Sequence, residues 1–177
     1  LNTHQVAFSQ VELRKLDDWS KEGYTVVCFA DSGQLLALIA IADRIKEGVM
    51  EAIRHLQSEG IRIYMLTGDN ALTAGAVASK LGITDFRAEV MPSDKADFIE
   101  ELQAGGAVVA MVGDGINDSQ ALAQADVSIA MGKGSDIAID VAKITLITSN
   151  LDALPKAWKL SRQTVAAIRQ NLFWAFI

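Results

Sequence analysis

Residues 113–118, GDGIND, place two aspartates and an asparagine around two glycines, directly after the apolar run AVVAMV. The glycines already supply the backbone freedom that a tight turn needs, so the turn alone does not account for Asp114 and Asp118. Paired carboxylates at the end of a buried strand are ligands suited to Mg²⁺. The segment therefore predicts a magnesium site.

Two further polar clusters lie at predicted element boundaries. TGDN (67–70) directly follows the apolar run IRIYML, and PSDK (92–95) opens a predicted helix. Taken singly, TGDN also fits an ordinary turn with a helix N-cap, and a lysine in the first turn of a surface helix is usually solvated. Together with GDGIND, however, they supply a hydroxyl, free backbone N–H groups, a lysine and paired carboxylates. This combination predicts a phosphoryl-transfer site.

The apolar pattern divides the chain near Asp43. Before that residue, a helix over 11–22 precedes two apolar runs, 24–30 and 35–42, which DSGQ joins as an antiparallel hairpin. After it, helices alternate with short buried strands, as in a parallel sheet covered on both faces. The expected helices are 47–60, 71–82, 93–106, one from about Asn117 and one over 136–142, and the expected strands are 61–66, 86–90, 107–112, 127–131 and 144–147.

We therefore predict an α/β fold: a doubly wound parallel sheet of Rossmann type, with an antiparallel hairpin from a second domain at the N-terminus. In open parallel sheets, ligands bind beyond the carboxyl ends of the strands, where the polar clusters fall.

Composition narrows the possible partners. The 177-residue chain has a net charge of −6 and no basic block before its last helix, so nucleic acid is not an expected partner. The single cysteine, Cys28, lies in an apolar run, which predicts a core thiol in a reducing compartment. His4 and His55 have no second ligand at metal-binding spacing, so we interpret both as ordinary helix or tail residues.

The C-terminal segment changes character along its length. Four basic residues (Lys156, Lys159, Arg162 and Arg169) precede the apolar stretch NLFWAFI. Basic residues followed by aromatic and apolar residues mark the cytosolic end of a membrane helix. The alternative is an amphipathic terminal helix that packs on its own domain. The N-terminus has no signal-peptide pattern, and no apolar stretch approaches the length that crosses a bilayer.

The motifs MLTGDN, AEVMPSDKADFIEELQ, VAMVGDGINDSQALAQADVSIAMGKGSDIAIDVA and SRQTVAAIRQNLFWAF occur in this order. They resemble the haloacid-dehalogenase-like second half of the phosphorylation domain of heavy-metal P-type ATPases, and copper exporters most of all. The resemblance runs from about Tyr24 to Ile177. TGDN combined with GDGIND is highly specific for P-type ATPases within the haloacid-dehalogenase-like superfamily.

The resemblance implies a role for each polar residue. Thr67 and Gly68 would contact the phosphoryl group, and Asp69 would support the nucleotide side of the site. Lys95 would stabilise the phosphate during transfer.

In the second cluster, Asp114 would bind Mg²⁺, and Asp118 would hold the ion or the groups around it. Asn117 would donate a hydrogen bond to a phosphoryl oxygen. Asp43 matches the hinge at which the chain re-enters the phosphorylation domain from the nucleotide-binding domain.

The implied domain organisation has three parts. Residues 1–42 would be the C-terminal part of a nucleotide-binding domain, and 43–155 the second segment of the phosphorylation domain. Residues 156–177 would form a basic stalk helix that leads into a transmembrane helix. The phosphorylated aspartate of the D-K-T-G-T motif has no match here, and neither has a site for the transported ion, so we expect the chain alone to be inactive.

The resemblance thus implies part of an ATP-driven heavy-metal transporter that uses Mg²⁺ and ATP and hydrolyses ATP through an aspartyl phosphate. NLFWAF resembles the copper-type helix, which makes Cu⁺ the expected cargo. The protein would be an integral membrane protein, with this segment facing the cytoplasm.

Two other interpretations stay open. The chain could be a complete Mg²⁺-dependent phosphatase with Asp43 as its nucleophile, although Ile45 then stands where such an enzyme needs a polar side chain. It could also be a nucleotide-binding or docking module without catalysis.

Overall fold

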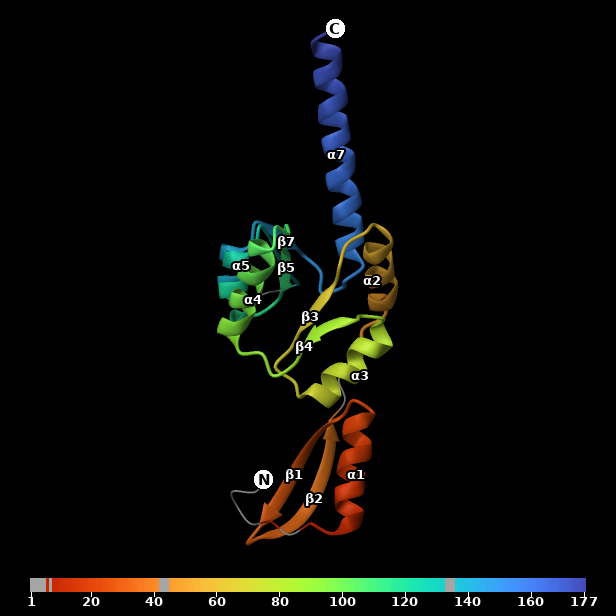
Figure 1. The fold of residues 1–177 in the computed structure, drawn as a ribbon, viewed down its shortest axis with the longest axis vertical. Helices are drawn as coiled ribbons and strands as arrows, with labels where there is room; N and C mark the ends of the chain where they lie inside the picture. Colours follow the sequence, from red (N-terminus) through yellow and green to blue (C-terminus); the bar gives the residue numbers. More distant parts are fainter. Residues whose placement is uncertain (1–5, 7, 42–44, 133–135) are drawn as a thin grey trace. The chain divides into compact units, whose positions relative to one another are not determined.

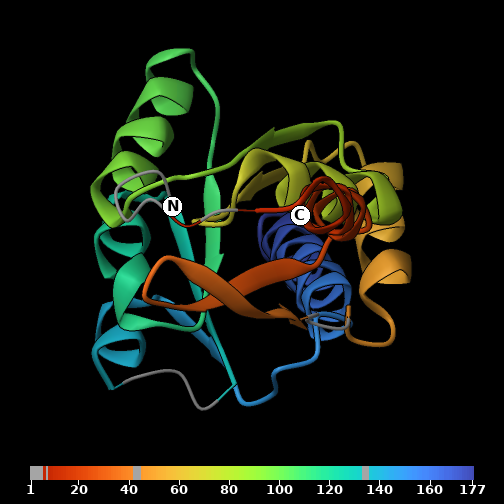
Figure 2. The same ribbon diagram turned by 90° about the horizontal axis from the view of Figure 1, so that it is seen from below.

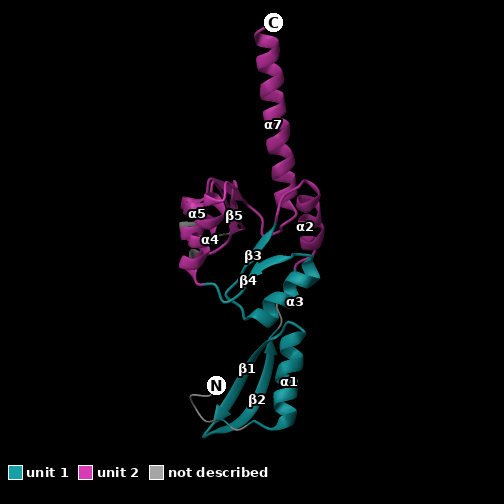
Figure 3. Cartoon of the chain, viewed as in Figure 1, with its two compact units in different colours: residues 1–45, 63–90 teal, residues 46–62, 91–177 magenta. Residues whose placement is uncertain are grey.

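The computed structural model describes residue 6 and residues 8–41, 45–132 and 136–177. It divides into two compact units, which Figure 3 colours separately: residues 1–45 with 63–90, and residues 46–62 with 91–177. The predicted hinge, Asp43, lies outside the described residues.

Unit 1 begins with a helix and a hairpin. Helix α1 (Gln10–Lys21) starts at a capping box, in which the Ser9 hydroxyl and the Glu12 carboxylate each accept a hydrogen bond from the other residue's backbone N–H. Strands β1 (Thr25–Asp31) and β2 (Gln34–Ile41) pair antiparallel. Ser32 and Gly33 connect them with φ of 48° and 82°, which a two-residue hairpin turn requires. The predicted hairpin is confirmed.

The two faces of the hairpin differ in cover. Figure 1 shows α1 lying along it, and Val26, Cys28 and Leu38 are half-buried. Cys28 is a free thiol. The opposite face exposes Val27 and Phe29 among other apolar side chains. The sheet is therefore apolar on both faces and covered by a helix on one of them.

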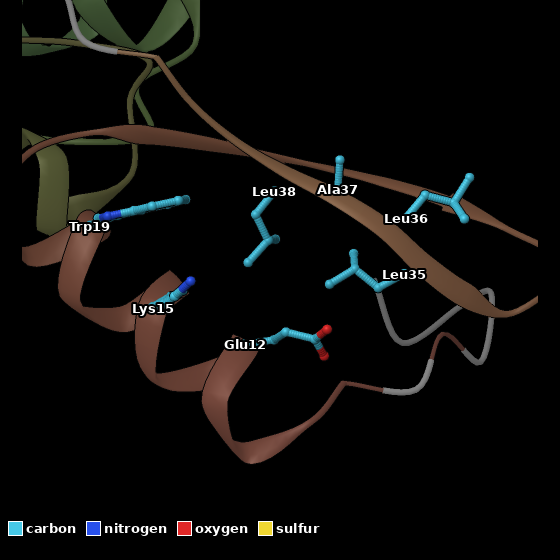
Figure 4. Close-up of a pocket in the computed structure, with 7 residues that line it drawn as sticks. All are labelled: Glu12, Lys15, Trp19, Leu35, Leu36, Ala37 and Leu38. Atoms are coloured by element: carbon cyan, nitrogen blue, oxygen red, sulfur yellow. The ribbon is translucent and has the colours of Figure 1, made fainter.

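A cavity of about 230 Å³ lies between α1 and β2 (Figure 4). Glu12, Lys15 and Trp19 of the helix line it, together with residues 35–38 of the strand. Leu35 and Leu38 point toward the helix in this view. None of the predicted site residues that the structure describes lines this cavity.

The rest of unit 1 is a βαβ element. Strands β3 (Tyr64–Leu66) and β4 (Asp85–Arg87) pair in parallel, and helix α3 (Ala71–Leu81) connects them. The α3 helix begins at Asn70, whose side chain accepts the N–H of Thr73, and ends at Gly82 with φ of 69°. The expected strand 61–66 is shortened to its last three residues because β4 offers only three pairing partners.

Unit 2 holds a three-stranded parallel sheet in the order β5 (Ala110–Gly113), β6 (Val127–Met131) and β7 (Ile144–Leu146). Its described helices are α2 (Val49–Ser58), α4 (Pro92–Ala104), α5 (Ser119–Gln124), α6 (Asp136–Val141) and α7 (Ala153–Ala175), with a 3-10 helix η2 (Ile116–Asp118) before α5. Ile99 of α4 packs on Ala121 and Ala125, and Leu122 packs on Ala130. This core fixes α4 and α5 against the sheet, and so positions the loop between β5 and α5.

The carboxylate of Asp126 accepts two hydrogen bonds beside the start of β5. It accepts the N–H of Val109 at 2.9 Å and the side-chain amide of Gln103 at 3.0 Å. The expected strand 107–112 therefore begins later, at Ala110, because the N–H of Val109 bonds to a side chain rather than to a neighbouring strand. The Val109 hydrogen bond, followed by that of Gln103, lowers the pKa of Asp126 below its ordinary value.

This pKa shift predicts a pH-dependent stability. A carboxyl group whose pKa is lower in the folded state stabilises the fold only while it is ionised. We expect wild type to be more stable than Asp126→Asn at neutral pH. The advantage should disappear as the pH falls below about 4, the ordinary range of an aspartate, and through the lower folded pKa. Urea unfolding of both proteins across this range measures the difference; a constant difference at every pH would contradict the prediction.

Helix α7 is one continuous helix, seen almost end-on in Figure 2. Near its middle, Arg162 donates to the carboxylate of Glu59 at 2.6 Å, which joins α7 to the end of α2. Further along, Leu172, Phe173 and Trp174 are each more than half exposed. No helix among the described residues is long and apolar enough to cross a membrane. The continuation into a membrane helix stays a prediction.

The predicted α/β architecture is confirmed, with parallel strands connected by helices and one antiparallel hairpin. The helix expected from about Asn117 begins as the 3-10 helix η2 and becomes α-helical only at Ser119. A tighter first turn is common at helix ends, and here it follows directly on the GDG turn.

Candidate phosphoryl-transfer site

The GDGIND loop follows directly on β5 in unit 2. The strand ends at Gly113, and Asp114 then lies exposed at its carboxyl end. Through η2 the chain turns back, with the N–H of Asp118 donating to the carbonyl of Gly115 at 3.2 Å. The loop therefore brings Asp118 back beside the end of the strand while it leaves Asp114 open to solvent.

Gly113 and Asp118 are in close contact. A Cβ atom on Gly113 would lie 2.7 Å from Oδ2 of Asp118 and 2.8 Å from its Cβ. The expectation that the glycines supply backbone freedom is wrong for both, because neither Gly113 nor Gly115 has a positive φ. Gly113 is needed because the Asp118 side chain packs where its own side chain would be.

Lys95 forms an ion pair with Asp118. Its Nζ lies 2.7 Å from Oδ1 of Asp118, and the two side chains are 15% and 14% exposed. The alternative interpretation of Lys95 as a solvated surface lysine is therefore wrong. Helix α4 places it: Pro92 is in the first turn, and the Asp94 carboxylate accepts the N–H of Met91 at 3.0 Å. Asp94 caps its own helix, whereas Lys95 turns toward the GDGIND loop.

The donor set of this loop suits Mg²⁺. Mg²⁺ keeps several waters and binds proteins through one or two carboxylates together with phosphate oxygens. Asp114 supplies an exposed carboxylate, and Asp118 supplies a second one that is held by Lys95. Among the described residues no group of three or more His, Cys, Asp or Glu could hold a metal ion, so a site that demands a full protein cage does not fit.

The TGDN turn lies in unit 1. The Thr67 hydroxyl donates to the carboxylate of Asp69 at 2.8 Å and accepts the backbone N–H of Asp69 at 3.1 Å. The N-cap of α3 is Asn70 rather than Asp69, so TGDN does contain the turn and the helix N-cap of the ordinary interpretation. Gly68 is exposed between Thr67 and Asp69.

The structure thus gathers the predicted residues into two groups. Lys95, Asp114, Asn117 and Asp118 belong to unit 2, where Lys95 and Asp118 are in contact and Asn117 is exposed on η2. The residues Thr67, Gly68 and Asp69 form one turn of unit 1. The sequence analysis did not identify Gly113 as a packing residue. It also did not identify Asp126 as the acceptor of hydrogen bonds at the start of the sheet. The GDG and ADV patterns give no separate signal for either role.

Comparison with known proteins gives the family of this chain. The model of the haloacid dehalogenase-like hydrolase family matches residues 5–126. The chain belongs to the haloacid dehalogenase-like hydrolases. This haloacid dehalogenase-like chain is 52% identical over 161 residues to the probable copper-transporting ATPase PacS of Synechococcus elongatus, covering 91% of this chain and 22% of the relative. It is 46% identical over 173 residues to a copper-exporting P-type ATPase of Staphylococcus haemolyticus, covering 98% of this chain and 22% of the relative.

Among solved structures, a zinc-transporting PIB-type ATPase matches with a TM-score of 0.80 and 36% identity, over 93% of this chain and 27% of that one. The resemblance to heavy-metal P-type ATPases is confirmed, and so is the haloacid dehalogenase-like fold. The chain spans about a fifth of the length of the curated relatives that it matches.

Proposed function

We propose that this chain is part of an ATP-driven heavy-metal cation transporter. It contributes the Mg²⁺-binding and phosphate-stabilising half of an aspartyl-phosphate site, and the phosphorylated aspartate lies outside these 177 residues. The observation that carries the proposal is the ion pair between Lys95 and Asp118, held beside the exposed Asp114 at the end of β5. The relatives, which are named as copper-transporting and copper-exporting ATPases, support it.

The GDGIND loop of unit 2, together with Lys95, would stabilise the negative charge on the phosphoryl group during its transfer. The carboxylates of Asp114 and Asp118 would hold Mg²⁺, which neutralises charge on the phosphoryl oxygens when it is bound. Lys95 brings a cation to the same loop, and Asp118 fixes where its ammonium group lies. Asn117 would donate its amide N–H to a phosphoryl oxygen. Groups already held in place lose no free energy to reorganisation during the reaction.

The turn of unit 1 would bind the phosphoryl group itself. Thr67 and Gly68 would contact its oxygens, and Asp69 would support the nucleotide side, with ATP as the phosphoryl donor. The Thr67 hydroxyl now donates to Asp69, so it would have to exchange this partner for a phosphoryl oxygen. Asp69 thereby keeps the hydroxyl oriented until a phosphate competes for it.

The proposal extends to organisation and location. Residues 1–42 would complete a nucleotide-binding domain, 43–155 would continue the phosphorylation domain after a hinge at Asp43, and 156–177 would form a stalk helix. The exposed apolar end of α7, after its basic residues, fits a segment that leads from the cytoplasm into the membrane. Cu⁺ is the proposed cargo, and its binding site would lie elsewhere in the protein.

The test is metal-stimulated ATP hydrolysis by the full-length protein. We expect Cu⁺ and Ag⁺ to stimulate hydrolysis and Zn²⁺ to leave it at its basal rate. Stimulation by Zn²⁺ alone would overturn the copper assignment. If no metal produces acid-stable labelling of the protein from ATP, the proposed transporter function is wrong. If the protein hydrolyses a small aryl phosphate and Asp43→Asn abolishes this hydrolysis, the phosphatase alternative is favoured.

A further inference from the structure

The segment after β4 crosses the TGDN turn in unit 1. The N–H of Thr67 donates to the carbonyl of Arg87 at 3.1 Å. In the other direction, the N–H of Glu89 donates to the carbonyl of Asp69 at 2.8 Å, and the N–H of Val90 donates to the carbonyl of Thr67 at 3.0 Å. Three backbone hydrogen bonds therefore join the proposed phosphoryl-binding turn to residues 87–90.

Glu89 has an unusual backbone conformation at this crossing. Its φ is +56°, and among the described residues only Ser32 is another non-glycine residue with a positive φ. Ser32 lies in the hairpin turn, where such a value is required. Glu89 lies in no hairpin, and its side chain is exposed. A left-handed conformation is costly for a residue with a Cβ, so the surrounding contacts must hold it.

The hydrogen bonds explain this conformation. Through Arg87 the chain runs as a strand parallel to β3, and in extended backbone the N–H groups of successive residues would point to opposite sides of the strand. The positive φ at Glu89 reverses the local course, so that two successive N–H groups reach carbonyls of the same turn. The left-handed residue and the two hydrogen bonds therefore depend on one another.

We propose that residue 89 is a positioning residue for the phosphoryl-binding turn, and that it acts through its left-handed backbone rather than through its carboxylate. The inference rests on the proposed function of Thr67 and Gly68. A site that binds a phosphoryl group must hold its donors to a fraction of an ångström, so the turn that carries them needs support. Residues 87–90 supply that support.

The first test measures the hydrogen bonds directly, by hydrogen exchange of the full-length protein. Valine is β-branched and tolerates positive φ poorly, whereas alanine removes the carboxylate and adds no branch. In Glu89→Val we expect the peptide covering residues 88–91 to exchange about tenfold faster, and in Glu89→Ala at the wild-type rate. Ser32→Val is the matched control, because it places the same strain in the hairpin turn and should accelerate exchange only there.

The second test measures phosphoenzyme formation from ATP in the same four proteins. We expect Glu89→Val to form phosphoenzyme about tenfold more slowly, while Glu89→Ala and Ser32→Val match wild type. A loss in Glu89→Ala as large as that in Glu89→Val would overturn the inference, since the carboxylate would then be the active group. Wild-type exchange and labelling in Glu89→Val would overturn it as well.

The two tests separate this inference from the proposed function. If the wild-type protein forms no phosphoenzyme, the proposed function fails, and the exchange rates still decide whether residue 89 holds the turn. If the wild type is labelled and exchange at residues 88–91 is equal in all four proteins, the positioning role fails and the transporter stands.

Discussion

We expect that replacing Asp114 with asparagine in the full-length protein abolishes phosphoenzyme formation, with labelling from ATP reduced at least about a hundredfold. Asparagine keeps the shape of the side chain and removes its negative charge, so it weakens a Mg²⁺ ligand without filling or emptying space. Asp114 is exposed directly after β5, so its carboxylate is open to an ion from solvent. Rapid-quench labelling with radioactive ATP measures the loss.

Asp97→Asn is the matched control for that substitution. Asp97 is an exposed aspartate on α4 of the same unit. Its substitution removes the same negative charge at a position outside the GDGIND loop. We expect it to label normally. Both variants should unfold within about 0.5 kcal/mol of wild type, because both side chains are exposed. Normal labelling of Asp114→Asn at saturating Mg²⁺ would contradict the role of this carboxylate.

The sequence predicted those parts of the structure that depend on residues close together in the chain. The hairpin follows from two apolar runs around a turn sequence, and Ser32 and Gly33 take the left-handed conformations that such a turn demands. GDGIND stood out because a turn does not need two carboxylates. The alternation of helices and strands after Asp43 predicted parallel pairing, and β3 with β4 and β5 with β6 are parallel.

Contacts between distant segments could not be predicted in the same way. Lys95 and Asp118 are 23 positions apart, and only the packing of α4 on α5 brings their side chains together. The close approach of Asp118 to Gly113 depends on the course of η2, which no residue pattern specifies. Glu89 gives no signal at all, because glutamate is not a residue that favours positive φ. Strand bounds also failed where a side chain, such as that of Asp126, replaced a strand neighbour.

Gly113→Ala is expected to destabilise the chain by about 2–4 kcal/mol and to stop phosphoenzyme formation in the full-length protein. The new Cβ would lie 2.7–2.9 Å from three atoms of the Asp118 side chain, a separation that van der Waals repulsion forbids. Rotation of the Asp118 side chain cannot relieve this clash, because its Cβ moves only with the backbone, so η2 must shift and carry Asp118 away from Lys95. That shift leaves the Lys95 and Asp118 side chains, each about 85% buried, without each other as partners.

Gly115→Ala provides the matched control in the same loop, because the nearest atom to its new Cβ would be the Asn117 nitrogen at 3.9 Å. Its stability should change by less than about 1 kcal/mol. Urea unfolding measures the difference in free energy of unfolding between the two variants. A double-mutant cycle then shows whether the clash with Asp118 causes that difference. In an Asp118→Gly background, Gly113→Ala should destabilise the protein little, because the side-chain atoms that the new Cβ would meet are absent. Equal stabilities for Gly113→Ala and Gly115→Ala would show that Asp118 moves aside freely. The contact between Gly113 and Asp118 would then not fix the Lys95–Asp118 ion pair. The proposed phosphoryl-transfer site would lose the fixed ion pair on which it rests.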